Sequence, residues 1–147
     1  MQTAATAFVA PIVIATPTPI DTLRLAIDQL EVANYDPNGI VLHPNDWAKV
    51  ELTKESTGGY IKSDPALANV RTLWGRGVVV TTAQTAGTFL VGDFQRAATL
   101  YDRQDPTLDI ATQDQDDFLR NLLKLRMELR LSLTVELPGA LVTGEFA

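Results

Sequence analysis

The most regular hydrophobic pattern in the chain lies at residues 123–135, where every second side chain is apolar. The apolar positions run from Leu123 to Val135, and the positions between them are charged or carry hydroxyl groups. Period two over this length is typical of a β-strand with one dry face and one wet face. Such a strand would extend about 43 Å, whereas a compact chain of this length has a radius of gyration of about 15 Å. We therefore expect an elongated subunit that reaches its neighbours rather than a compact enzyme.

Helical spacing of apolar residues predicts two helices in the first third of the chain. Thr18 can cap the first helix, with Pro19 at the first helical position and Asp21 completing a capping box. This helix should end near Asn34, before an Asp-Pro-Asn-Gly turn. The second helix is expected to open at Pro44.

The remaining pattern predicts short strands around a long polar loop at residues 54–70. The expected strands cover residues 12–14, 39–42, 78–80, 88–94, 99–103, 108–111 and 140–142. The Asp105-Pro106 pair should break the chain between two of them, and Thr112 should open a short acidic helix. Helices and strands are interspersed without a regular βαβ repeat, so the predicted fold class is α+β.

Composition limits the classes of function. The chain has 147 residues, 46% of them apolar, which suits one domain or one domain plus a piece of another. It has no cysteine, so disulfides and thiolate chemistry are excluded. A net charge of −6 argues against a broad surface for nucleic acid. No apolar run is long enough to predict a membrane span.

Candidate catalytic and metal-binding residues all have simpler interpretations. His43 is the only histidine and stands at a predicted helix start, where a capping role is expected. Three neighbouring aspartates suggest a calcium loop, but the glycine and final glutamate of an EF-hand are absent. They are expected to complement a helix dipole: Asp114, Asp116 and Asp117. We predict no catalytic set, no metal, no cofactor and no small-molecule substrate.

The glycines and tryptophans are also assigned structural roles. Four glycines form neither a dinucleotide-binding fingerprint nor a phosphate loop, and are expected at turns and strand breaks: Gly75, Gly77, Gly87 and Gly92. Trp47 and Trp74 are expected to anchor the core.

The wet face of the long strand has two interpretations. It carries four charged side chains: Lys124, Arg126, Glu128 and Arg130. They form either a solvated face with pairs across neighbouring strands or ion pairs between subunits. The sequence favours neither.

Several short motifs follow one another in a definite order. They are the helix at 18–34, Gly-Ile-Val-Leu-His-Pro at 39–44, Asp46-Trp47, Gly58-Gly59-Tyr60-Ile61, Leu73-Trp74-Gly75, Val78-Val79-Val80, Ala86-Gly87-Thr88, Val91-Gly92-Asp93-Phe94, Asp102-Arg103, Phe118, Asn121 and Arg130-Leu131. In this order and spacing they resemble the C-terminal half of a tailed-phage major capsid protein with the Hong Kong 97-like fold. The resemblance covers about residues 18–146.

The resemblance implies a fold and a division of the chain. It implies an axial domain, with a mixed sheet flanked by helices, plus a long strand that belongs to a peripheral domain. Residues 1–17 would be an extended lead-in, and residues 18–118 the axial domain. Residues 119–147 would supply the long strand and a C-terminal strand shared between the two domains.

The resemblance also implies a structural function: a subunit of an icosahedral phage or prophage shell that self-assembles into pentamers and hexamers. Its partners would be copies of itself and, further, the scaffold, protease or portal of the phage, with no membrane and no specific nucleic acid. The shell would be made in the bacterial host cytoplasm and end in the virion. Subunit contacts are expected at the wet-face charges and in the polar loop, at Gly58, Gly59, Tyr60 and Asp64.

In the family, an N-terminal arm, an extended loop and a spine helix precede the region that resembles this chain. We therefore expect a fragment, a proteolysed product or a truncated prophage copy whose apolar strand face is uncovered and self-associates. Some family members crosslink a lysine of the extended loop to an asparagine, helped by a glutamate. The matching positions here are Asn121 and Glu128, although Asn121 also suits a helix-to-strand hinge.

Three alternatives stay open. An encapsulin-type nanocompartment shell shares this fold but encloses cargo enzymes. A self-crosslinking capsid protein would use Asn121 and Glu128. A monomeric α+β domain without assembly would leave the over-long strand unexplained.

Overall fold

The computed structural model describes residues 2–53, 70–112, 116 and 119–146. The chain forms two compact units, residues 1–98 with 135–147 and residues 99–134. Residues 99–112 belong to the same unit as the long strand, and the division into axial residues 18–118 and residues 119–147 stays a prediction.

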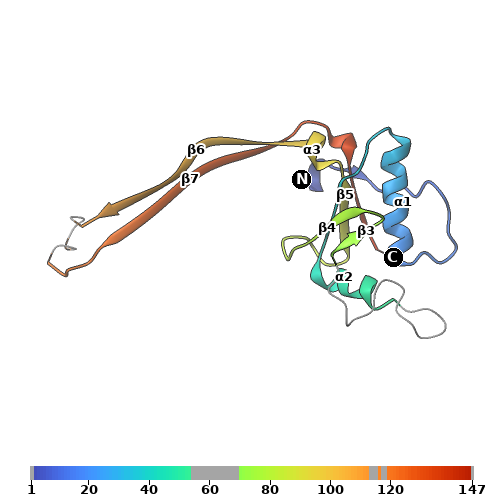
Figure 1. The fold of residues 1–147 in the computed structure, drawn as a ribbon, viewed down its shortest axis with the longest axis horizontal. Helices are drawn as coiled ribbons and strands as arrows, with labels where there is room; N and C mark the ends of the chain where they lie inside the picture. The colour runs from blue at the N-terminus through green and yellow to red at the C-terminus, as the bar shows by residue number, and fades with distance from the viewer. Residues whose placement is uncertain (1, 54–69, 113–115, 117–118, 147) are drawn as a thin grey trace. The chain divides into compact units, whose positions relative to one another are not determined.

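The first unit is built on a six-stranded mixed sheet with the order β1-β8-β5-β2-β4-β3 (Figure 1). The strands are β1 (Thr6–Ala7), β2 (Gly39–Leu42), β3 (Thr72–Leu73), β4 (Arg76–Val80), β5 (Thr88–Gly92) and β8 (Leu141–Glu145). β1 and β8 run parallel, as do β2 and β4, and the other pairs are antiparallel. Both edges of the sheet end in two-residue strands, which leave little edge for uncontrolled pairing.

Two helices cover one face of this sheet. They are α1 (Pro19–Val32) and α2 (Pro44–Glu51). The core between them and the sheet includes Leu23 and Ile27 from α1, Trp47 from α2, and Phe89 from β5. Both helices begin as predicted, with Thr18 and His43 as N-caps. The first ends at Val32, two residues earlier than expected.

The sequence predictions for this unit were wrong or incomplete at several points. The lead-in contains a short 3-10 turn (Gln2–Ala4) and β1, and no strand at residues 12–14. Pairing with β8 ends at Phe8, whose N–H donates to the carbonyl oxygen of Thr143, because the N–H of Val9 donates to Gln29 of α1 instead. β3 and the short helix α3 (Phe94–Ala97) were not predicted.

Trp74 is 48% exposed and does not anchor the core, in contrast to Trp47. Trp74 and Gly75 both have positive φ, at 48° and 76°, and form the two-residue turn between β3 and β4. A turn of this type turns its first side chain away from the sheet interior. The other expected turn glycine, Gly87, also has positive φ.

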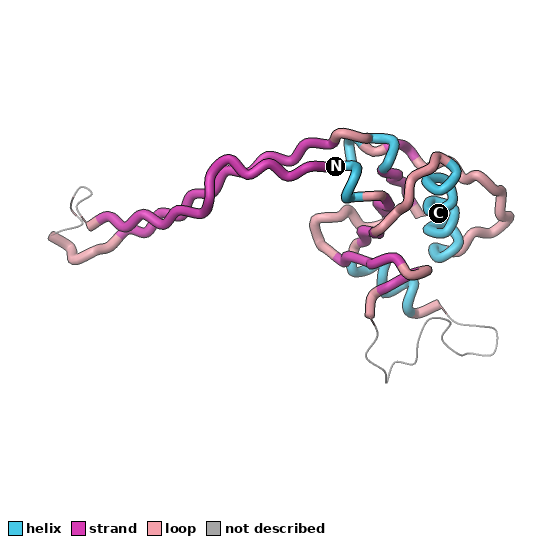
Figure 2. Tube along the Cα trace, turned by 45° about the horizontal axis from the view of Figure 1, so that its top comes forward, coloured by secondary structure: helices cyan, strands magenta, loops and turns pink. Residues whose placement is uncertain are grey.

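The second unit is a hairpin of two long strands, β6 (Ala98–Ala111) and β7 (Lys124–Val135). The strands run side by side in opposite directions (Figures 1 and 2). The long strand was predicted correctly, but β6 is continuous where a break at Pro106 was expected. In a two-stranded ribbon each strand has one edge without a partner, so a proline there removes no ladder hydrogen bond. Of the expected acidic helix, Asp116 and residues 119–121 form turns, and the rest lies outside the described residues.

Candidate subunit-contact surfaces

The hairpin exposes one apolar face. Arg126 of β7 donates to Asp109 of β6 at 2.7 Å, so these two side chains share a face. Because side chains alternate along a strand, the leucines of β7 lie on the opposite face. The apolar residues on that face of β7 are 47–75% exposed: Leu125, Met127, Leu129, Leu131 and Leu133. Leu108 and Ile110 flank Asp109 in β6, lie on the same apolar face and are also exposed.

This exposure is unusual for a soluble element. Single exposed leucines are normal, whereas a contiguous apolar surface of this kind marks a site of interaction with another protein. A two-stranded hairpin is also marginally stable by itself in water. The hairpin therefore has the character of an element that is completed by a further layer of protein.

The wet face carries ion pairs within the chain. Arg126 bonds to Asp109 across the two strands, and the guanidinium of Arg130 bonds to Glu128 on the same strand at 2.6 Å. The hydrogen bond to Asp109, followed by the charges of Asp109 and Glu128, raises the pKa of Arg126 above its ordinary value. These contacts agree with the expectation of a face paired within the chain. Ion pairing between subunits, which was expected for Lys124 as well, stays a prediction.

The two candidate crosslinking residues lie in different parts of the hairpin. Asn121 belongs to the turn before β7 and has a φ of 53°, a left-handed conformation that asparagine tolerates well. Glu128 lies within β7, where Arg130 holds its carboxylate. A role of Glu128 as proton acceptor would require this ion pair to open. The expected loop contacts at Gly58, Gly59, Tyr60 and Asp64 lie outside the described residues.

His43 caps α2. Its Nδ1 accepts a hydrogen bond from the backbone N–H of Asn45 at 3.1 Å, and Pro44 follows at the first helical position. This confirms the capping interpretation. Over the part of the chain that the structure describes, no three side chains of the metal-ligating types cluster, and no helix is long and apolar enough to cross a membrane.

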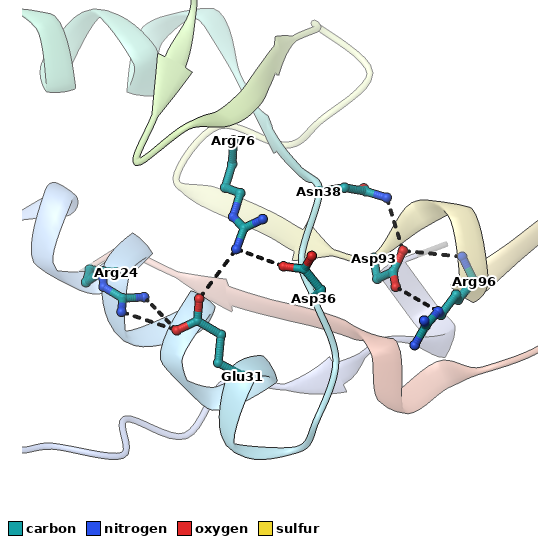
Figure 3. Close-up of polar contacts among 7 residues, drawn as sticks. All are labelled: Arg24, Glu31, Asp36, Asn38, Arg76, Asp93 and Arg96. Atoms are coloured by element: carbon teal, nitrogen blue, oxygen red, sulfur yellow. Dashed lines mark hydrogen bonds and ion pairs between the residues drawn. The ribbon is translucent and has the colours of Figure 1, made fainter.

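A buried aspartate fixes the end of β5 in the first unit. Asp93 caps α3 and accepts a hydrogen bond from Asn38 Nδ2 at 3.0 Å (Figure 3). Asn38 Oδ1 in turn accepts a hydrogen bond from the backbone N–H of Phe94. Arg96 also lies against Asp93, at 3.6 Å. The sequence reasoning missed this site, although an aspartate directly after a strand glycine is a possible N-cap signal.

A second polar cluster links β4 to the end of α1. Arg76 bonds to Asp36 at 2.8 Å and lies 3.5 Å from Glu31, which also binds Arg24 (Figure 3). All four side chains are partly solvent-exposed, so each pair contributes little on its own. Together they act by position, because the guanidinium of Arg76 in β4 holds the turn after α1 against the sheet.

Comparison with known proteins gives the same family as the sequence motifs. A family model described as the phage capsid family matches residues 1–146. The major capsid protein of Enterobacteria phage HK97 is 39% identical over 127 residues, which make up 86% of this chain and 33% of that protein. The chain thus spans about a third of the length of this curated relative.

Solved structures share the fold at low sequence identity. Microbacterium phage Oxtober96 gives a TM-score of 0.73 at 14% identity, covering 98% of this chain and 52% of that one. The capsid of an empty GTA particle gives 0.66 at 18% identity, covering 82% of this chain and 43% of that one. A virus-like particle from Pyrococcus furiosus gives 0.61 at 18% identity, covering 97% of this chain and 56% of that one. The predicted α+β capsid fold is therefore confirmed.

Proposed function

Since this chain belongs to the phage capsid family, we propose that it is a structural subunit of an icosahedral phage or prophage shell. Copies of the chain would associate into pentamers and hexamers, and the finished shell would be the capsid of the virion, made in the host cytoplasm. Scaffold, protease and portal proteins of the phage are further partners in this proposal.

The apolar face of the β6–β7 hairpin is the observation that carries the proposal. Five alternating apolar side chains of β7 are about half exposed or more in the single chain, from Leu125 to Leu133. Burial of apolar surface contributes about 25 cal/mol per Å², so leaving this face in water costs free energy that association recovers. A shell subunit uses such a face to bind its neighbours, which supports the proposal.

The encapsulin-type alternative receives less support. The relative at 39% identity is named a major capsid protein. The resemblance to the Pyrococcus furiosus particle supports only a shared fold. Genes for terminase, portal and protease beside this gene would favour a phage shell, whereas a ferritin-like or peroxidase cargo gene would favour an encapsulin.

Covalent crosslinking through Asn121 and Glu128 is a separate proposal. A lysine amine would attack the side-chain amide carbon of Asn121 and form a new amide bond, the original C–N bond of that amide would break and release ammonia, and Glu128 would accept the proton of the amine. It is supported by the match of both positions to the family pattern, and it requires a lysine from another segment. A denaturing gel of assembled particles tests it: bands above the monomer that disappear in Asn121→Ala support crosslinking. A single monomer band in the assembled native protein would contradict it.

Light scattering on a size-exclusion column, at several protein concentrations, tests the shell proposal. We expect pentamers, hexamers or larger particles whose share grows with concentration. A monomer at every concentration would contradict self-assembly of this chain. Electron microscopy of the largest fraction would then show whether the particles are closed shells.

A further inference from the structure

A row of glycines crosses three neighbouring strands of the six-stranded sheet, near one end of each strand. Gly39 of β2 lies opposite Gly92 of β5 on one side and opposite Gly77 of β4 on the other. Paired residues on adjacent strands point to the same face, so this row forms a side-chain-free band on the face opposite α1 and α2. Gly77 was expected at a turn or strand break and lies inside β4 instead, whereas Gly92 is the last residue of β5.

Two of the three glycines are covered by other parts of the chain. A Cβ on Gly92 would lie 2.5 Å from Leu141 Cδ2 and 2.8 Å from the carbonyl oxygen of Ala140. A Cβ on Gly39 would lie 3.0 Å from the ring of Phe94. At Gly77, by contrast, no atom of the described residues lies within 4 Å of an added Cβ. Among the residues that the structure describes, the second layer over the sheet therefore ends at Phe94, and the β4 end is open.

The open end is an apolar groove of about 560 Å³. Its walls include Phe94, Val41 and Val79, with Gly77 on its floor, and Val79 is 57% exposed. Polar atoms contribute a small part of its lining, through Asn38, Arg71 and Thr72. The groove is therefore suited to an uncharged, apolar segment of polypeptide.

The same chain carries such a segment on its other side. Residues 9–14, here called the strap, have no charged side chain, and Val9, Ile12 and Val13 are 69%, 61% and 93% exposed. The strap begins at a hydrogen bond from the N–H of Val9 to Gln29 of α1. A cavity of about 140 Å³ separates it from α1, so it is not closely packed against its own chain.

The strap and the groove lie at opposite ends of the first unit. The strap follows β1, at one edge of the sheet, and runs beside α1, whereas residues of β4, near the other edge, line the groove. They also lie on opposite faces, because α1 covers the face away from the glycine row. The strap of a chain therefore lies away from that chain's own groove, with its N-terminal end bound to Gln29 of α1.

We propose that the strap of one copy docks into the groove of the next copy, with Ile12 and Val13 continuing the apolar layer that ends at Phe94. The contact is head-to-tail, and repeating such a contact around an axis closes a ring. This inference rests on the proposed function and names the surfaces that would hold a pentamer or hexamer together. The occupant is a second copy of this chain, because apolar strap and apolar groove occur on one molecule in positions that only two copies can join.

Disulfide trapping tests the contact directly, because the native chain has no cysteine. Val13→Cys and Val79→Cys variants are purified separately, mixed and oxidised mildly, and a non-reducing gel shows dimers formed between different copies. A disulfide needs Cα atoms within about 7 Å, so docking should raise its rate about tenfold over a control mixture of Val13→Cys with Val32→Cys. Val32 is also exposed, at 72%, but lies at the end of α1. Equal rates in the two mixtures would overturn the proposal.

Gly77→Leu provides a second test that does not depend on thiols. Gly77 has no positive φ and open space above it, so leucine should leave the thermal unfolding midpoint unchanged while filling the groove. We expect about tenfold weaker association of Gly77→Leu by light scattering, with Val32→Leu as the matched control. Association equal to that of the control would overturn the docking mode.

The same samples separate the two proposals. Particles that form without the Val13–Val79 disulfide would leave the shell proposal standing and reject strap docking. The disulfide without closed particles would support docking and reject shell formation by this chain alone. If neither closed particles nor the Val13–Val79 disulfide formed, both proposals would be rejected.

Discussion

The backbone N–H of Gly87 donates to Oδ2 of Asp46 at 2.6 Å, which links the first turn of α2 to the turn between β4 and β5. The other oxygen of Asp46 binds Nζ of Lys49 at 2.8 Å. Asp46 is 1% exposed, and Gly87 has a φ of +86°, a conformation that favours glycine. The carboxylate thus joins two parts of the first unit, α2 and the turn before β5, across 41 positions of sequence.

Asp46→Asn should destabilise the protein at neutral pH and have less effect in acid. Burial alone raises the pKa of Asp46, but the hydrogen bonds from Lys49 and Gly87 and the charge of Lys49 outweigh it, so the net pKa is lowered. A lowered pKa contributes stability above the unfolded value of about 3.9, and this stability is lost as the pH falls through the folded pKa. We expect a loss of about 1–3 kcal/mol at pH 7, measured by urea unfolding.

The matched control is Asp28→Asn on α1, for which we expect little change at either pH. Urea titrations at pH 7 and pH 3 compare the two variants with the native chain. The native protein and Asp46→Asn are compared by their free energies of unfolding. If the difference between them were as large at pH 3 as at pH 7, the charge of Asp46 would be unimportant for stability.

Two glycines of the same row should respond in opposite ways to alanine. Gly92→Ala would place a methyl group 2.8 Å from the backbone oxygen of Ala140, which cannot move without shifting β8. We expect a loss of about 1–3 kcal/mol, typical of overpacking. Gly77→Ala meets no atom within 4 Å and should be neutral or stabilise by about 0.4–1 kcal/mol, because it restricts the unfolded chain.

Urea unfolding of the two alanine variants side by side decides this point. If Gly77→Ala lost as much stability as Gly92→Ala, the groove would be filled in the native protein. The open end of the glycine row would then be an incorrect description.

Thr18→Ala should weaken the start of α1 and change the titration of Asp21. The hydroxyl of Thr18 donates to Oδ2 of Asp21 at 2.6 Å and accepts from the N–H of Asp21. The side-chain hydrogen bond, followed by the one from the backbone N–H of Thr18, lowers the pKa of Asp21. Loss of the cap should cost about 1 kcal/mol, and NMR should show the pKa of Asp21 move up toward its ordinary value. An unchanged pKa in Thr18→Ala would refute the capping box.

Local signals predicted the helices well because their causes are local. Thr18, Pro19 and Asp21 form a complete N-terminal signal within four residues, and His43 with Pro44 forms another. The alternation that predicted β7 is also a local property. Each of these elements carries its own start or its own period in the sequence.

What the sequence could not give depends on contacts between distant residues. Pro106 was expected to break a strand, and only the two-stranded pairing of β6 makes it harmless. Trp74 was expected in the core because the sequence shows its large apolar side chain but not its positive φ, which places it in a turn. The glycine row is a matter of register, since nothing local places Gly39 between Gly77 and Gly92.

Leu129→Lys should reduce association without unfolding the first unit. Leu129 lies in the middle of the apolar face of β7 and is 47% exposed in the single chain. If another copy covers this face, a lysine there would be buried without a partner, which is costly. Light scattering should therefore show smaller species at equal concentration, while the unfolding midpoint of the first unit stays unchanged.

Ser132→Lys is the matched control for this prediction, because Ser132 lies on the wet face of the same strand, where a further charge stays in water. If both lysine variants associate like the native chain, the apolar face does not take part in assembly. If Leu129→Lys instead fails to fold, the face is internal core of the chain itself. Reduced association in Leu129→Lys alone is the result that a contact between subunits requires, because the two variants differ only in the face that carries the charge.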